Sequence, residues 1–299
     1  MRPHCFLTAA LFFALASLPQ PAQPHDGSSP GLQQRERQTE RFVASRTVAQ
    51  GGAQSDPNDP CDERNWGSDD DHYRHCEVRE ETLPAGPLTV DAGRNGSVRV
   101  EGSDRTDIRV RAIVQAYARE EARAKELGSQ VQVQSSGHRI QSAGPQTERR
   151  EWWSVSYRID VPRRNDLELV ANNGGIAISD VNGTIRFDTS NGGVRLDDVA
   201  GSVRGRTRNG GLRVVLAGQR WDGEGLDVET TNGGVTLAIP DGYNAALETR
   251  TVNGSFRTDY PITIQGELNY RRGLSTTLGA GGAPVRVRTT NGGLRINRR

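Results

Sequence analysis

Alternating apolar and polar residues run through most of the chain from residue 88 onward. The alternation covers residues 88–100, with Asn95-Gly96 in its middle, and returns at 108–114 and 153–161. Because every second side chain of a strand points to one face, these segments predict half-buried strands. The Asn-Gly pair predicts a tight turn, and Pro162 is expected to end the last strand.

Residues 119–127 interrupt this alternation with residues that favour helices, and Gly128 follows them. The segment therefore predicts a helix that ends near Gly128. Alternation resumes at Val131 and Val133. We expect residues 61–162 to form an N-terminal cap of strands and one helix.

After Pro162 the chain repeats the motif Asn-Gly-Gly-apolar-x-apolar. Full copies begin at Asn173, Asn191, Asn209, Asn232 and Asn291, a degenerate copy begins at Asn253, and half-way copies begin at Asn182 and Ala200. The module is nine residues long, but the full motif matches best at a period of 18.

Each module predicts a turn followed by a short strand, because Asn and Gly tolerate positive φ at low steric cost. Two modules would form one coil, and equal coils can stack about 4.8 Å apart. One inner column would hold Ile176, Val194 and Leu212, and a second would hold Ile178, Leu196 and Val214. The asparagines at 173, 191, 209, 232 and 291 would form a structural ladder at one corner, with side-chain amides bonded along the column.

The expected fold is therefore an all-β, single-stranded β-solenoid, or β-helix, over residues 163–299. An antiparallel meander with Asn-Gly hairpins also fits nine-residue modules. We favour the solenoid because a meander gives no reason for every second module to match. The later spacings of 23 and 21 residues predict coils with insertions near 220–222 and 241–243.

Composition agrees with short strands and frequent turns. Hydrophobic residues make up 33% of the 299 residues, aromatic residues make up 5%, and 35 residues are glycine. These values disfavour a helix bundle or a large α/β enzyme. The net charge of +1 disfavours nucleic acid as a partner.

The N-terminus is typical of an exported protein. An apolar run at 6–15 followed by Ala14-Leu15-Ala16 predicts a signal peptide over residues 1–16, although an uncleaved anchor is the alternative. Residues 17–60 are polar and rich in Gln, Pro and Ser, which predicts a disordered linker. No later run is long enough to cross a bilayer, so we expect a periplasmic, outer-surface or secreted protein.

Cys61 and Cys76 predict a disulfide in this exported chain. The loop between them holds Asp69, Asp70, Asp71 and His72, and His75 precedes Cys76. Metal binding by this loop is the alternative, but the spacing matches no zinc site with four converging ligands. We expect no metal and no cofactor.

Catalytic patterns are weak in this sequence. None of the five histidines lies in the repeats, which excludes a Ser-His-Asp arrangement there. The acids on successive coils are Asp180, Asp188, Asp197 and Asp198, and they leave a polysaccharide-active enzyme as the alternative. We interpret them as solvated charges at corners and on the outer face.

Arginines mark a candidate binding face. Arg195, Arg213 and Arg295 each lie between two inward positions, and Arg204, Arg206 and Arg208 alternate along another module. Stacked arginines repel one another unless an anion or an acid lies between them, so an anionic glycan or envelope polymer is a possible partner. A surface of salt bridges with Asp188 and Asp197 is the alternative interpretation.

The Asn-Gly-Gly-Val-x-Leu series, the entry Leu167-Glu168-Leu169 and the segment 228–234 carry a family resemblance. Over about residues 78–299, the chain resembles a bacterial family of β-strand-repeat domains of unknown function named putative adhesins. The resemblance implies an extracytoplasmic β-helix and assigns no functional residues. It does not explain the linker or the Cys61–Cys76 loop. We predict a non-enzymatic exported protein with a structural or adhesin-like role.

Overall fold

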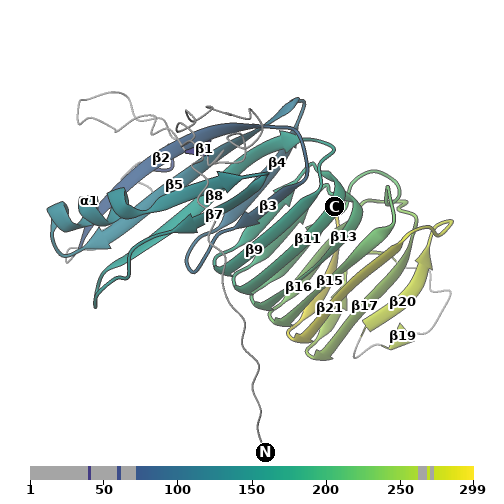
Figure 1. Ribbon diagram of the computed structural model, residues 1–299. Helices are drawn as coiled ribbons and strands as arrows, with labels where there is room; N and C mark the ends of the chain where they lie inside the picture. The colour runs from purple at the N-terminus through teal and green to yellow at the C-terminus, as the bar shows by residue number, and fades with distance from the viewer. Residues whose placement is uncertain (1–39, 42–58, 62–71, 262–267, 270–272) are drawn as a thin grey trace, which may run out of the picture. The chain divides into compact units, whose positions relative to one another are not determined.

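The computed structural model describes residues 40–41, 59–61, 72–261, 268–269 and 273–299. The predicted signal peptide and most of the predicted linker lie outside these residues. The described chain consists of β-strands and one helix (Figure 1). Its strands form two mixed sheets, one of twelve strands and one of ten.

The N-terminal part holds the expected helix and antiparallel strands. Its elements are β1 (Glu40–Arg41), β2 (Tyr73–Pro84), β3 (Leu88–Asp91), β4 (Val98–Ser103), β5 (Asp107–Ala118), α1 (Glu121–Gln130), β6 (Gln132–Ser136), β7 (Arg139–Ala143) and β8 (Trp152–Pro162). Strands β2, β5 and β8 pair antiparallel, as do β6 and β7. The helix packs on β2 and β5 through Ala124 and Leu127, which are fully buried.

The repeats form an alternation of long and short strands. They are β9 (Leu167–Asn173), β10 (Ile176–Ser179), β11 (Asn182–Asn191), β12 (Val194–Asp197), β13 (Ala200–Asn209), β14 (Leu212–Val215), β15 (Gly225–Asn232), β16 (Val235–Ile239), β17 (Ala245–Asn253), β18 (Phe256–Thr258), β19 (Leu268–Asn269), β20 (Gly273–Leu278), β21 (Pro284–Asn291) and β22 (Leu294–Arg298). In each coil the long strand joins the twelve-stranded sheet and the short strand joins the ten-stranded sheet. The corner between them is Asn-Gly-Gly, or Asn-Gly-Ser in the coil of β17 and β18.

Neighbouring coils pair in parallel and in register. Ile176 lies opposite Val194, and Val194 lies opposite Leu212, in the pairs β10–β12 and β12–β14. The second column, which holds Ile178 and Leu196, is also present. The predicted columns are confirmed, and the meander alternative is wrong for these repeats. Antiparallel pairing within the sheets is found among β2, β5 and β8, among β1, β6 and β7, and among β17, β20 and β19.

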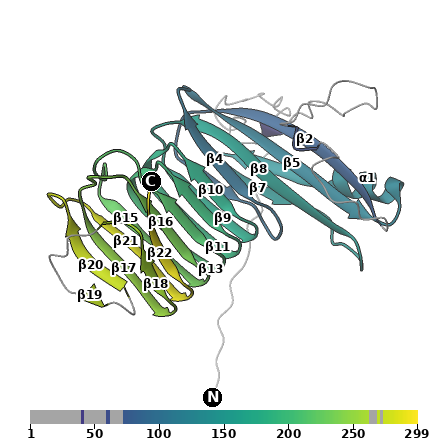
Figure 2. The same ribbon diagram turned by 180° about the vertical axis from the view of Figure 1, so that it is seen from behind.

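The order of the coils in space differs from their order in the chain. The last coil, β21 and β22, lies between the coil of β15 and β16 and the coil of β17 and β18. Figure 2 shows β22 between β16 and β18. The coil of β17 and β18 therefore does not pair with the coil that precedes it in the chain. Residues 284–298 form the coil that lies between the two.

A ladder of asparagines marks the Asn-Gly-Gly corner. Each Nδ2 donates a hydrogen bond of 2.8–3.1 Å to the Oδ1 of the next asparagine, in the order Asn253, Asn291, Asn232, Asn209, Asn191, Asn173 and Asn95. The predicted ladder is confirmed, and it extends to Asn95 and Asn253. Beneath it, buried threonines such as Thr207 donate to a glycine carbonyl of the neighbouring coil, at 2.8 Å from Gly192 O.

The reason for glycine at this corner differs from the sequence-based expectation. Gly174 and Gly192 are not among the residues with positive φ. Instead, a Cβ added to Gly192 would lie 2.0 Å from the carbonyl oxygen of Gly174. Close stacking of one backbone on the next therefore requires the first glycine. The left-handed conformation belongs to the opposite corner, where Asp180 and Asp198 have φ of 58° and 54°.

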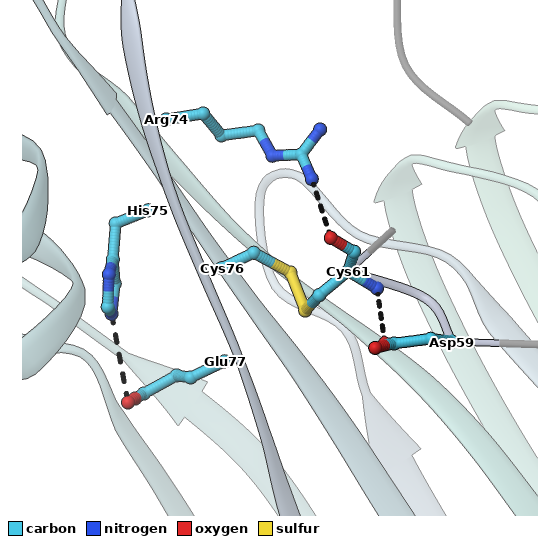
Figure 3. Close-up of a disulfide and its surroundings, with 6 residues drawn as sticks. All are labelled: Asp59, Cys61, Arg74, His75, Cys76 and Glu77. Atoms are coloured by element: carbon cyan, nitrogen blue, oxygen red, sulfur yellow. Dashed lines mark hydrogen bonds and ion pairs between the residues drawn. A yellow bond between two sulfur atoms is a disulfide. The ribbon is translucent and has the colours of Figure 1, made fainter. Parts of the chain in front are cut away.

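The predicted disulfide joins Cys61 to Cys76 of β2, with 5.7 Å between their Cα atoms (Figure 3). Asp59 accepts a hydrogen bond from the Cys61 amide, and Arg74 donates to the Cys61 carbonyl. Because Cys76 is bonded to sulfur, it offers no thiolate to a metal. Asp69, Asp70 and Asp71 of the metal alternative lie outside the described residues, and the described part contains no cluster suited to a metal ion.

Candidate anion-binding surface

One face of the ten-stranded sheet packs against the core, and the other is exposed. A row of side chains crosses this exposed face at right angles to the strands, because the parallel register places equivalent residues side by side. This arginine row consists of Arg158, Arg99, Ala177, Arg195, Arg213, Thr236, Arg295 and Arg257, in order from β8 to β18. Six of these eight residues are arginine, and none of the eight is acidic.

Most of the guanidinium groups in the arginine row have no acidic partner. Arg195 forms a salt bridge with Asp197 on its own strand. The side chains of Arg99, Arg213, Arg257 and Arg295 are exposed, and none of them forms a hydrogen bond or salt bridge in the part of the chain that the structure describes. These four cations are therefore available to an external anion.

Electrostatic repulsion is visible at the β8 end of the row. Burial lowers the pKa of the Arg158 guanidinium below its usual value, and the positive charges of Arg99 and Arg111 lower that pKa further. The carboxylate of Asp59 opposes this effect. Arg111 of β5 lies beside Arg158 and so extends the arginine row by one strand. Its Nη2 lies 3.4 Å from Oδ2 of Asp160. A bound anion would relieve the repulsion between these neighbouring cations.

A shallow hollow of about 300 Å³ lies in the arginine row. Arg99 and Arg195 stand on its two sides, and the small side chain of Ala177 lies between them. Gly175 and Gly193 also line the hollow. A ligand that contacts both arginines would therefore find room for an uncharged group between them.

The exposed face of the twelve-stranded sheet is different, because acids and arginines are interleaved on it. Arg206 bonds to Asp188 at 2.7 Å, and Arg286 bonds to Glu248 at 3.1 Å. Arg204 and Arg208 share this face with Arg206, since they alternate along β13. The six candidate arginines are thus divided between two faces. The salt-bridge interpretation fits Arg206 with Asp188 on this face and Arg195 with Asp197 on the other, whereas Arg204 and Arg208 form no salt bridge within the described chain.

Three of the four candidate acids lie near one another on neighbouring coils, since Asp180, Asp197 and Asp198 all raise the pKa of Arg299. Asp188 and Asp197 lie on opposite sheets, and each is bonded to an arginine of its own face. Asp198 receives two hydrogen bonds from Arg299 at 2.6 and 3.0 Å, and Asp180 lies 3.4 Å from Arg163. These carboxylates are therefore held by arginines, and none of the four acids lines the hollow in the arginine row.

Three members of the arginine row were missed by the sequence-based prediction. Arg158 lies on β8, outside the repeats, and Arg257 lies in the degenerate copy that begins at Asn253. Arg99 had a detectable signal, because Asn95-Gly96-Ser97-Val98-Arg99-Val100 has the motif's spacing with serine in place of the second glycine.

A second hollow, of about 610 Å³, lies beside α1. Its lining mixes both signs of charge, and Arg123 is held by Glu151 through bonds of 2.9 and 3.1 Å. Because its arginines and glutamates neutralise one another, this hollow carries less net positive charge than the arginine row. Separately, in the described part of the chain no helix is long and apolar enough to cross a bilayer.

Comparisons with known proteins connect the repeats to a family. Residues 155–297 match the family model described as Toastrack DUF4097. No curated protein matches the chain. Among solved structures, a putative cell adhesion protein from Clostridium sporogenes ATCC 15579 is 10% identical, with a TM-score of 0.38, over 75% of this chain and 100% of that one.

Two further solved structures are similar over the same share of this chain. A putative adhesin from Bacteroides fragilis NCTC 9343 is 9% identical, with a TM-score of 0.28 and 97% of its own chain covered. A putative lipid binding protein from Parabacteroides distasonis ATCC 8503 is also 9% identical, with a TM-score of 0.24 and 96% covered. The match to the Toastrack DUF4097 family model thus covers the strand repeats of this chain, over residues 155–297.

Proposed function

We propose that this protein is a non-enzymatic, extracytoplasmic contact module that binds an anionic polymer through the arginine row. The observation that carries this proposal is the set of four exposed arginines, Arg99, Arg213, Arg257 and Arg295, that have no acidic partner in the described chain. Strand pairing fixes their positions before any ligand arrives. Little conformational entropy is therefore lost from the backbone on binding.

The proposed architecture is a single-stranded β-solenoid over residues 163–299, with residues 61–162 as its N-terminal cap. Each coil supplies one long and one short strand, and parallel register repeats the same face from coil to coil. We also propose a signal peptide at 1–16 and a linker at 17–60. The Cys61–Cys76 disulfide supports an oxidising compartment such as the periplasm or the cell exterior.

The ion pairs of the candidate acidic residues support the non-enzymatic role. General acid–base cleavage of a glycosidic bond needs two carboxyl groups on either side of the bond. Here Asp188, Asp197 and Asp198 are each bonded to an arginine, and Asp180 lies 3.4 Å from Arg163. The arginines of the row offer charge and hydrogen-bond donors, which suit recognition of carboxylate, sulfate or phosphate groups.

Binding to polygalacturonate tests the proposal. Affinity is measured by calorimetry at low and high salt for the wild-type protein and for the double variant Arg195→Ala/Arg213→Ala. The matched control is Arg204→Ala/Arg208→Ala, which removes two arginines from the opposite sheet. We expect at least a tenfold loss of affinity for the first variant, little change for the control, and weaker binding at high salt.

Two outcomes would overturn the proposal. Binding that falls equally in both double variants, or that is absent for polygalacturonate and for linear polyphosphate alike, would remove the arginine row as the contact surface. Release of reducing sugar from the same incubation would show that the protein is an enzyme. Circular dichroism of both variants checks that a loss of affinity does not come from unfolding.

A further inference from the structure

The arginine row has an internal period. Its arginines form three doublets on adjacent strands: Arg158 with Arg99, Arg195 with Arg213, and Arg295 with Arg257. A single uncharged residue separates each doublet from the next, Ala177 in the first gap and Thr236 in the second. The doublets therefore recur every third strand.

Strand spacing converts this period into a length. Neighbouring strands lie about 4.8 Å apart, so the two arginines of a doublet start about 5 Å apart and successive doublets start about 14 Å apart. The first and third doublets are separated by six strand intervals, which is about 29 Å. A ligand that reaches all three must extend along the stacking direction of the coils.

Each doublet has the chemistry to hold one anionic group. Two guanidinium groups at this separation can donate to the same carboxylate or sulfate from both sides. Every doublet includes at least one arginine without an acidic partner among the described residues, namely Arg99, Arg213, and both Arg295 and Arg257. The third doublet is consequently the least neutralised of the three.

The first gap suits an uncharged unit with substantial volume. The hollow of about 300 Å³ lies over Ala177, between Arg99 and Arg195. On one side, the middle of the row borders glycines, including the exposed Gly193 and Gly211, so no side chain obstructs a ligand at those strands. A thin chain of linked phosphates would leave this hollow empty, whereas a sugar ring would fill it.

We propose that the arginine row binds a linear acidic polysaccharide laid across the strands, with an anionic group on each doublet and uncharged parts of sugar rings over Ala177 and Thr236. This inference rests on the proposed function, and it adds the ligand class, the direction of the chain and the number of subsites. Binding at three linked subsites makes affinity depend on chain length, because the later contacts are intramolecular.

Oligogalacturonates of increasing length, from trimer to dodecamer, test this inference by calorimetry. We expect the dissociation constant to fall by at least a hundredfold between an oligomer that covers one doublet and one that spans all three. The variant Arg295→Ala/Arg257→Ala should weaken dodecamer binding at least tenfold and trimer binding less than twofold, because a trimer retains two other doublets.

A second pair of variants tests the path between doublets. Ala177→Glu places an acid in the first gap and should weaken dodecamer binding at least tenfold. Thr231→Glu adds the same charge to an exposed position of the opposite sheet and should leave the affinity within twofold. Thermal unfolding of both variants checks that the fold is retained.

The outcomes separate this inference from the proposed function. Trimer and dodecamer binding of equal strength, both lost in Arg195→Ala/Arg213→Ala, would overturn the three-subsite arrangement and leave the anion-binding function in place. Tight binding of linear polyphosphate together with no binding of oligogalacturonate would overturn the polysaccharide as ligand. If neither oligogalacturonate nor polyphosphate binds, both proposals are overturned.

Discussion

The Cα of Gly192 faces the carbonyl oxygen of Gly174 so closely that an added Cβ would lie 2.0 Å from that oxygen. Gly192→Ala should therefore destabilise the fold by about 3 kcal/mol, since the obstructing atom belongs to the backbone of the next coil. That loss corresponds to a Tm decrease of roughly 6–12 °C in a domain of this size. Thermal unfolding followed by circular dichroism measures it.

The control for that experiment is the next residue in the chain. A Cβ added to Gly193 would lie 3.5 Å from Gly211 O, which is an ordinary contact. Gly193→Ala should change stability by less than about 1 kcal/mol. Equal Tm decreases in the two variants would show that close stacking of the backbone is not the reason for the first glycine.

The asparagine ladder has a direction, and this predicts different effects at its middle and at its end. Asn209 donates to Asn191 and accepts from Asn232, whereas Asn95 only accepts, from Asn173. Asn209→Asp loses the donated bond and places two acceptors together, which should cost about 1–2 kcal/mol. Asn95→Asp keeps its accepting oxygen and should be nearly neutral.

Protonation provides a further check on the ladder. A protonated aspartic acid at position 209 can donate again, so stability of Asn209→Asp relative to the wild-type protein should recover as the pH falls below about 4. Urea unfolding at several pH values measures this difference. A pH-independent deficit, or an equal deficit in Asn95→Asp, would contradict the hydrogen-bond direction.

Phe187 and Gly205 are neighbours in the core of the twelve-stranded sheet, and the ring occupies the space that a side chain at 205 would need. A Cβ added to Gly205 would lie 2.5 Å from the ring carbons of Phe187. Gly205→Ala should cost about 1–3 kcal/mol through overpacking. Adding Phe187→Leu should reduce that cost, and a double-mutant cycle by urea unfolding measures the coupling. Additive effects would show that the two side chains are independent.

Glu77 contributes stability that depends on pH. The His75 ring, whose Nε2 lies 3.8 Å from Glu77 Oε2, lowers the pKa of the Glu77 carboxyl below its usual value, and Arg79 adds to this effect, although burial opposes it. Because the folded-state pKa is lowered, the contribution is present above pH 4.5 and is lost as the pH falls through the folded-state pKa. Glu77→Gln should therefore destabilise the protein at pH 7 and have a smaller effect at pH 3.

Urea unfolding of Glu77→Gln at the two pH values tests this sign. Glu168→Gln is the matched control, because Glu168 is exposed and forms no salt bridge within the described chain. It should show little change at either pH. A deficit in Glu77→Gln that is as large at pH 3 as at pH 7 would contradict the assigned interaction.

The sequence predicted the stacking of the coils correctly because each copy carries its own register. Asn191 and Asn209 are spaced by one full coil, so equal spacing brings them side by side. The reason why the first glycine of each motif is required could not be predicted. The sequence shows the glycine, but not the carbonyl oxygen of the neighbouring coil that approaches it. Similarly, Arg158 enters the arginine row through pairing with Arg99, a residue distant in sequence.

The position of the last coil also could not be derived from the sequence. Asn253 and Asn291 offer the same corner chemistry, and either copy could follow Asn232 in the ladder. Local patterns specify how a coil pairs with a neighbour, but they do not specify which copy that neighbour is. The hydrogen bonds of β21 to both β15 and β17 decide the order.

This arrangement has a consequence for biogenesis. During synthesis β17 and β18 emerge before β21 and β22, the two strands that attach them to the preceding coil. The coil of β17 and β18 can therefore pair with the rest of the sheets only after β21 and β22 have been synthesised. Assembly of these sheets waits for strands that come later in the chain, and a chain cut after β20 would lack the segment that joins β17 to β15.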